Sequence, residues 1–166
     1  MKRIIAGFVA FICFITLTLL PINASAHTDN SEGYSKIKME GDKLHVELHL
    51  DFFELGRLID FGVRPGAEED LLNNALAKQR GAVNEYLESH FEVFTDGAKA
   101  KGSVISTDIE NRVGRDYAKI GLEFPIPSDE SSIQINYSVF FDDNDSMHRN
   151  IMTYDLENKK GQYIFN

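Results

Sequence analysis

The sequence contains a single cysteine, Cys13, and no tryptophan. Cys13 lies inside a long apolar run near the amino terminus, and Phe11 and Ile12 before it do not form the small-residue context of a lipoprotein signal. The rest of the chain has no thiol, which excludes disulfides, a thiol nucleophile and thiolate metal ligands there. Any chemistry of that part must use histidine, carboxylate, hydroxyl or backbone groups.

Catalytic motifs are also lacking. The chain has no nucleophile elbow, no phosphate-binding loop, no HExxH helix and no histidine beside a recognisable nucleophile. We therefore predict that the protein is not an enzyme and assign no catalytic residue. A hydrolase that used Asp143 or Asp145 with His148 would need a cleft of convergent polar groups, which the sequence alone does not show.

Positive charge is scarce after the first few residues. Residues 1–26 hold two of the 17 basic residues and none of the 26 acidic ones, so residues 27–166 carry 15 basic and 26 acidic residues, a formal net charge of −11. A surface of this sign repels phosphate backbones and anionic headgroups but attracts cations. Neither nucleic acid nor an anionic membrane surface is an expected partner.

The first 26 residues have the order of a secretory signal peptide. Lys2 and Arg3 precede an apolar run over 4–20, which ends at Pro21 and the small-residue stretch 23–26. An uncleaved anchor is the alternative, because the run is only slightly shorter than the ~20 residues that span a bilayer. Ala24 and Ala26 favour cleavage after Ala26, which predicts an exported protein, extracellular or at the cell envelope.

Cleavage would leave 140 of the 166 residues, the usual length of a single domain. We therefore expect one extracytoplasmic domain over residues 27–166.

Hydrophobic periodicity predicts a mainly β fold. Residues 43–51 alternate strictly between apolar and polar side chains, and Gly41 with Asp42 forms a hairpin turn signal before them. Residues 53–90 instead have a helical period, with a longer helix starting near Ala67 that Gly81 weakens without ending. The sequence predicts a β-sandwich or half-barrel of about seven short antiparallel strands with a helical hairpin insertion at about 53–90. Strands are expected near 34–39, 43–51, 91–95, 99–109, 117–124, 133–141, 149–155 and 162–165.

His27 is the first candidate metal ligand. Cleavage after Ala26 would give it a free α-amino group beside its imidazole, and these two nitrogens can chelate one ion, particularly copper or nickel. The alternative is that His27 merely follows the cleavage site.

The loop after the 133–141 run is the second candidate metal site. It holds Asp142, Asp143, Asp145 and His148, but it lacks the glycine and the distal glutamate of a calcium loop. Asp145 and His148 with a nitrogen partner from elsewhere would suit a transition metal. The structural alternative is that Asp145 caps the turn while His148 packs or is solvated.

The polar face of the 43–51 strand is the third cluster. His45, Glu47, His49 and Asp51 alternate along it, and successive members stand roughly 6.6 Å apart, close enough for adjacent pairs to share a metal. A solvated strand face is the favoured interpretation.

Several of these features follow one another in an order that resembles a known family. They are the Ala26-His27 junction, Ser31 and Tyr34, the Gly41-Asp42 turn, a strand closing on Asp51, and the run 137–141 followed by Asp145, His148, Arg149 and Asn150. The chain is in these respects similar to the extracytoplasmic amino-terminal domain of the HupE/UreJ family of nickel-permease-like membrane proteins. The resemblance implies His27, Asp145 and His148 as candidate functional positions. A membrane protein of the cell envelope is the partner expected if the chain is instead an interaction module.

The chain departs from that family at two points. Residues 60–66 lack the aspartate-rich, calcium-like loop of many relatives, and after the signal no apolar stretch approaches ~18 residues. Transport by this chain alone is therefore not expected. The sequence predicts a metal-associated binding domain for a copper- or nickel-type ion. The alternative is a structural or protein-interaction module of the cell envelope that binds no metal.

Overall fold

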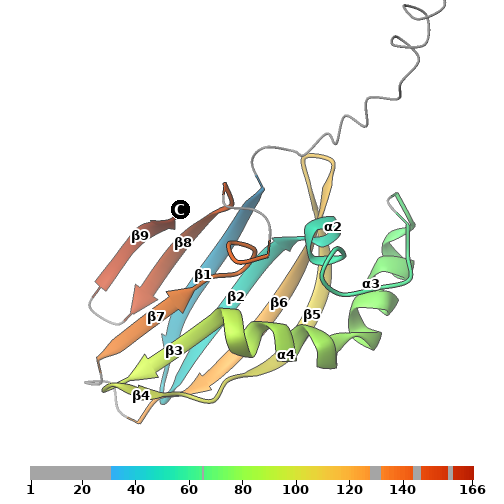
Figure 1. Ribbon diagram of the computed structural model, residues 1–166. Helices are drawn as coiled ribbons and strands as arrows, with labels where there is room; N and C mark the ends of the chain where they lie inside the picture. Colours follow the sequence, from blue (N-terminus) through green and yellow to red (C-terminus); the bar gives the residue numbers. More distant parts are fainter. Residues whose placement is uncertain (1–30, 65, 128–131, 144–146, 157–158) are drawn as a thin grey trace, which may run out of the picture.

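The computed structural model describes residues 31–64, 66–127, 132–143, 147–156 and 159–166. This part of the chain contains nine strands and three helices (Figure 1). In chain order they are β1 (Glu32–Glu40), β2 (Lys43–Asp51), α2 (Phe52–Leu55), α3 (Glu69–Lys78), α4 (Arg80–His90), β3 (Phe91–Thr95), β4 (Ala98–Lys99), β5 (Ser103–Arg112), β6 (Arg115–Pro125), β7 (Ile133–Tyr137), β8 (Arg149–Leu156) and β9 (Lys159–Phe165).

The larger sheet has six strands in the order β5-β6-β2-β1-β8-β9. Its neighbours pair antiparallel except for β1 and β8, which run parallel from Glu32 beside Arg149 to Lys38 beside Asp155. The hairpin between β1 and β2 turns at Gly41, whose φ of 62° lies in the left-handed region that glycine adopts without strain. The β1–β8 pair joins segments from the two ends of the described chain.

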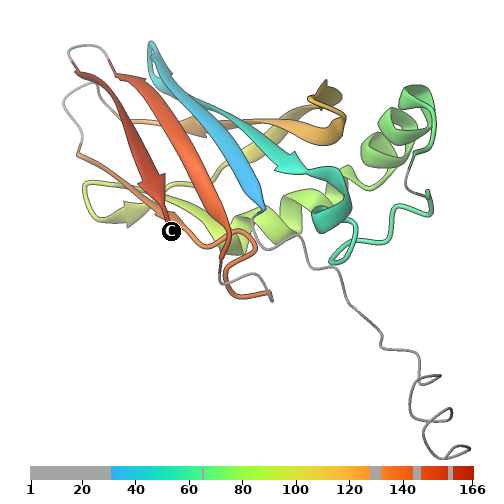
Figure 2. The same ribbon diagram turned by 90° about the horizontal axis from the view of Figure 1, so that it is seen from above.

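A second layer covers one face of this sheet. It consists of the three-stranded sheet β4-β3-β7 and of helices α3 and α4, as the two views at right angles show (Figures 1 and 2). Two asparagines attach the helices to the larger sheet, because Asn73 accepts a hydrogen bond from the Ile109 amide at 2.8 Å and Asn84 accepts one from the Val104 amide at 3.0 Å. These two bonds hold α3 and α4 against β5.

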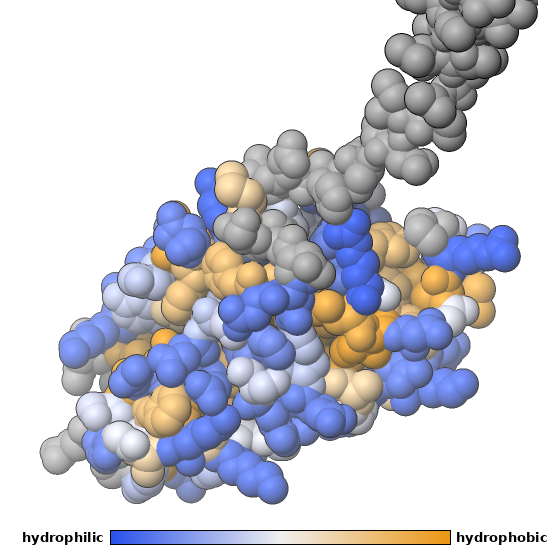
Figure 3. Space-filling view, viewed as in Figure 1, coloured by the Kyte–Doolittle hydropathy of each residue, from blue (hydrophilic) through white to orange (hydrophobic). Residues whose placement is uncertain are grey.

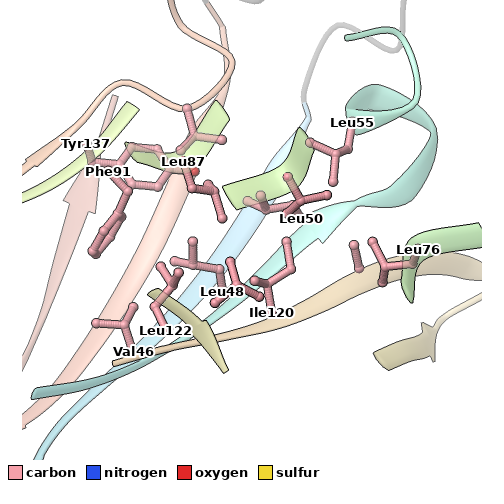
Figure 4. Close-up of a cluster of buried hydrophobic side chains, with 14 of the residues drawn as sticks. Val46, Leu48, Leu50, Leu55, Leu76, Leu87, Phe91, Ile120, Leu122 and Tyr137 are labelled. Carbon is pink, nitrogen blue, oxygen red and sulfur yellow. The ribbon is translucent and has the colours of Figure 1, made fainter. Parts of the chain in front are cut away.

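The core fills the space between the layers. Alternate residues of β2 and β6 point into it, and Leu87, Phe91 and Tyr137 meet them from the second layer (Figure 4). Burying a large apolar side chain contributes roughly 1.5–3 kcal/mol, so this double row is the main source of stability. The inward side chains of β2 and β6 are Leu44, Val46, Leu48, Leu50, Ala118, Ile120, Leu122 and Phe124.

The fold class is confirmed, and three elements differ from the prediction. The helix expected from Ala67 is divided at Gln79, whose side chain donates a hydrogen bond to the Asp60 carbonyl at 3.0 Å and holds the junction of α3 and α4. The strand expected over 133–141 ends at Tyr137, because the chain turns at Phe140 with a φ of 68°. The strand expected over 99–109 is divided into β4 and β5.

No helix within the described ranges combines the length and the apolar character needed to cross a membrane. On the face seen in Figure 3, apolar side chains form separate patches among charged ones rather than one continuous surface.

Candidate functional site

Of the three predicted metal-ligating residues, only His148 lies within the described residues. His27 and Asp145 lie outside them, so the predicted three-residue site is not tested by the structure. The structure therefore bears on the predicted site only through the residues that surround His148.

The parallel pairing of β1 with β8 brings the start of β1 next to His148. Ser31 precedes β1 directly, and its carbonyl oxygen accepts a hydrogen bond from the Arg149 amide at 3.1 Å. The Ser31 Oγ atom lies 2.7 Å from Nδ1 of His148. Two segments 117 residues apart in the sequence thus meet at this histidine.

His148 belongs to a buried chain of hydrogen bonds. Ser35 Oγ donates to Asn150 Oδ1 at 2.6 Å, and Asn150 Nδ2 donates to the Tyr137 hydroxyl at 3.2 Å. The same hydroxyl lies 2.9 Å from His148 Nε2. The other ring nitrogen of His148, Nδ1, lies 2.7 Å from Ser31 Oγ and ends the chain. All five residues are less than 9% exposed, so each would lose free energy if its partner were removed.

Matching each donor to an acceptor assigns one self-consistent direction to this chain. Because Tyr137 receives a hydrogen bond from Asn150, its single proton points to Nε2 of His148. Nε2 is then the acceptor, and the ring proton lies on Nδ1 and is donated to Ser31. Burial raises the pKa of the Tyr137 hydroxyl far above its ordinary value, which keeps that proton in place. In this tautomer both ring nitrogens of His148 have hydroxyl partners.

Close packing surrounds the polar chain. A Cβ atom added at Gly33 would lie 2.8 Å from Asn150 Nδ2 and 3.3 Å from His148 Cε1, so only glycine fits between Ser31 and Ser35 on this face of β1. The rings of Phe140 and Phe141 stand edge-on to the imidazole, with centroids 5.0 and 5.4 Å away. This environment holds His148 in one orientation.

The acidic loop before His148 is fastened to α4. The Tyr86 hydroxyl donates to Asp143 Oδ2 at 2.7 Å and accepts a hydrogen bond from the Phe140 amide at 2.9 Å. Burial and this bond to Asp143 raise the pKa of Tyr86 well above its ordinary value, so the hydroxyl remains a donor. The loop that carries the predicted Asp145 therefore has a fixed point at Asp143.

A second buried histidine lies on the outer face of the larger sheet. His49 is only 4% exposed, and its ring nitrogens lie 2.9 Å from Glu47 Oε1 and 2.8 Å from Glu110 Oε2. The expectation of a solvated strand face is wrong at this position, because the ring is buried and Glu110 reaches it from β5, on the far side of β6. Asp51, on the same face, accepts hydrogen bonds from the first amides of α2 and caps that helix.

Carboxylates beside His49 titrate below their usual range. Burial acts to raise the pKa of Glu47, but the hydrogen bond from His49 and the charge of Lys119 outweigh it and lower the pKa. The hydrogen bond from Arg112 lowers the pKa of Glu110. Charge pairs of this kind are stronger than neutral hydrogen bonds.

Sequence reasoning identified His148 but did not predict the buried chain that joins it to four other residues. The signal was present at the start of β1, where Ser31, just before the strand, and Gly33 and Ser35 within it occupy alternate positions on the face that should be apolar. Three small residues in that pattern indicate that side chains from another segment pack against this face of the strand, as His148 and Asn150 do. In the part of the chain that the structure describes, no three histidine, cysteine or acidic residues are grouped as metal ligands would be.

Comparison with known proteins adds no relative: no protein-family model matches the chain, and neither does any curated protein. The resemblance to the HupE/UreJ family therefore stays a prediction.

Replacing Tyr137 by phenylalanine tests the buried chain. Tyr137→Phe leaves His148 Nε2 and one Asn150 donor without a partner, and we expect it to lower the free energy of unfolding by about 1–3 kcal/mol in urea denaturation. Tyr163→Phe is the matched control, since Tyr163 is 56% exposed, and it should change stability by less than about 0.5 kcal/mol. Equal effects of the two substitutions would contradict the network.

The carboxylates beside His49 predict a pH dependence. Because the folded-state pKa of Glu47 lies below its ordinary value of 4.5, its contribution to stability is present above about pH 4.5 and is lost as the pH falls through the folded value. Glu47→Gln should flatten the fall in unfolding free energy as the pH drops below about 4.5. Glu85→Gln, at an exposed position of α4, should leave that slope unchanged, and an unaltered slope in Glu47→Gln would refute the assignment.

Proposed function

We propose that the protein, once its signal peptide is removed, is an extracytoplasmic domain that binds a copper- or nickel-type ion at its amino terminus. His27 would supply its α-amino and imidazole nitrogens, and Asp145 would supply a carboxylate oxygen. The domain would not transport the ion by itself.

One observation carries this proposal: the β1–β8 pairing joins the start of β1 to the histidine that ends the acidic loop. His27 precedes Ser31 by four residues, and a chain of that length spans at most about 14 Å. Ser31 is itself hydrogen-bonded to His148, three residues after Asp145. His27 and Asp145 are therefore each only a few residues along the chain from the Ser31–His148 hydrogen bond.

The role of His148 follows from its contacts. Both of its ring nitrogens have hydroxyl partners, and coordination at Nδ1 would require removal of the proton donated to Ser31. We assign His148 as the residue that holds the two ligand-bearing segments together. The sequence-based interpretation, in which His148 is itself a ligand, requires the ion to replace Ser31 at Nδ1.

The negative charge of the domain supports a cationic ligand. A formal net charge of −11 over residues 27–166 raises the local concentration of cations near the surface. Asp143, whose carboxylate accepts a hydrogen bond from Tyr86, adds negative charge two residues before Asp145.

Calorimetric titration with Cu²⁺ and Ni²⁺ tests the proposal. We expect protein that begins at His27 to bind one ion tightly, and we expect one extra residue before His27 to abolish that binding, because it removes the free amine from the chelate. His45→Asn, which alters a histidine on the far strand face, should bind as the unaltered protein does. Absence of binding in every form would overturn the proposal and favour an envelope interaction module.

A second set of variants distinguishes the two roles of His148. As a positioning residue, His148→Asn should weaken binding about 10- to 100-fold, as the loss of an outer-shell partner does, without changing the number of nitrogens seen by Cu²⁺ electron paramagnetic resonance. Loss of one coupled nitrogen would show that His148 is a ligand. Tyr137→Phe keeps the imidazole but removes the hydroxyl partner of its Nε2 atom. If His148→Asn does not fold, the affinity and the nitrogen count of Tyr137→Phe are compared with those of the unaltered protein instead.

A further inference from the structure

The two edges of the larger sheet differ in how their backbone groups are covered. β5 forms one edge and β9 forms the other. Figure 1 shows β5 on the side of the sheet where helices α3 and α4 lie, and β9 on the side away from them. An edge strand presents a row of unpaired N–H and C=O groups, which is a template for pairing with another chain. The treatment of each edge therefore shows which one the fold closes.

Side chains from the helices close the β5 edge. The Val104 amide donates to Asn84 at 3.0 Å, and the Val104 carbonyl accepts a hydrogen bond from Arg80. Further along the strand, the Ile109 amide donates to Asn73 at 2.8 Å. The register of β5 against β6 also shifts near its start, and a bulge of this kind hinders the addition of a further strand.

The β9 edge is open. β9 pairs with β8 in a single register without a shift, and it contains no proline. Leu156 and Lys159 pair across a two-residue connection, so they form the hydrogen-bonded closing pair, and alternate residues from there on direct their backbone groups to β8. Lys160, Gln162 and Ile164 direct theirs outward. Within the described part of the chain, these outward groups make no hydrogen bond.

Large apolar side chains lie exposed at the carboxyl end of β9. Tyr163 is 56% exposed and Ile164 is 49% exposed. Both line a hollow of about 270 Å³, to which Tyr137, Phe141 and Phe165 also contribute. Exposed apolar groups around a hollow are typical of an interaction surface. Open backbone groups and exposed apolar side chains thus coincide on the same strand.

The outward residues of β9 are arranged symmetrically about Gln162. If two copies of β9 run antiparallel about a twofold axis at Gln162, Lys160 of each copy lies opposite Ile164 of the other. Every outward N–H and C=O group then has a partner, and the two Gln162 side chains can hydrogen-bond to each other. On the other face of the strand, Tyr163 lies opposite Gly161, which leaves room for the ring because it has no side chain.

One end of β9 is basic, and an acidic loop begins near its other end. Lys160 pairs with Asp155 of β8 at 2.8 Å, which leaves Lys159 exposed and without an ion pair among the described residues. At the opposite end, Asp142 directly follows Phe141, which lines the hollow. Asp142 is likewise exposed and has no ion pair within the described ranges.

The antiparallel arrangement brings these opposite charges together. With the axis at Gln162, Lys159 of each copy lies opposite Phe165 of the other, at the end of β9 near which Asp142 is located. Symmetry forms this contact twice, and no two like charges of β9 face each other directly. The net charge of −11 repels a second copy at long range, but charges more than ~8 Å apart are largely screened at physiological ionic strength. Local complementarity therefore favours a second copy as the occupant.

We propose that β9 is a self-pairing edge, through which two copies of the protein join their larger sheets into one continuous sheet. A pair of seven-residue strands buries less surface than a standard protein interface, so the dimer is weak and reversible. The pairing requires no bound ion and does not depend on the proposed metal site.

Sedimentation equilibrium of the purified protein tests the proposal. We expect dimers to form as the concentration rises from micromolar to millimolar. A chelator is present throughout, which excludes dimers bridged by a metal ion. A protein that stays monomeric over this range would overturn the proposal and leave β9 as an edge for an extended segment of another protein.

Substitutions at Gln162 test the position of the axis. Gln162→Lys and Gln162→Glu each place like charges opposite each other, which should weaken the dimer about two- to fivefold, whereas an equal mixture of the two should recover it. Gln162→Pro removes an outward N–H that β8 does not use, and it should abolish the dimer. A mixture that associates no better than either variant alone would refute the twofold axis.

Ile105→Lys is the matched control on the other edge. Ile105 is 45% exposed on β5, and this substitution should leave the dimer unchanged. Loss of the dimer in Ile105→Lys together with its retention in Gln162→Pro would overturn the proposal in favour of the β5 edge. Amide spectra of the dilute variants, which should remain as dispersed as that of the unaltered protein, separate loss of pairing from loss of folding.

Discussion

The arrangement of this protein depends on the parallel contact between β1 and β8 and on the polar chain buried beneath it. Parallel neighbours cannot be joined by a tight turn, so this contact closes the fold over more than a hundred residues. Burial of five polar residues in a small core costs free energy unless each one has a partner. Here the donors and acceptors match in one direction, from Ser35 to Ser31 through His148, which favours this strand register over others.

Much of the fold could be predicted because its signals are local. The strict alternation of residues 43–51 and the glycine turn before them locate β2 and its hairpin, since a half-buried strand requires that period. The pairing of β1 with β8 could not be predicted, because no local pattern identifies the partner of a strand. The break at Gln79 depends in the same way on a distant group, the Asp60 carbonyl.

In the candidate site, too, residue types could be predicted from the sequence, but contacts between distant segments could not. His148 could be identified from residue types in an acidic loop, but its orientation depends on Ser31 and Tyr137, which other segments supply. His49 was expected to face solvent, and the fold instead encloses it between two carboxylates of different strands. A cavity lined by α4 and β6 lies beside the segment that joins β4 to β5, a path that no periodicity reveals. The sequence thus indicates which residue types could bind a ligand. Their burial and their hydrogen-bond partners depend on how the strands are arranged, which the sequence does not show.

The tautomer of His148 is the most direct measurement of the central claim. Long-range ¹⁵N correlation spectra of the imidazole distinguish a protonated ring nitrogen from an unprotonated one. The directed chain predicts a neutral ring with the proton on Nδ1 and an unprotonated Nε2 that accepts from Tyr137. A proton on Nε2, or a doubly protonated ring at neutral pH, would contradict the account of how the two ends of the fold are joined.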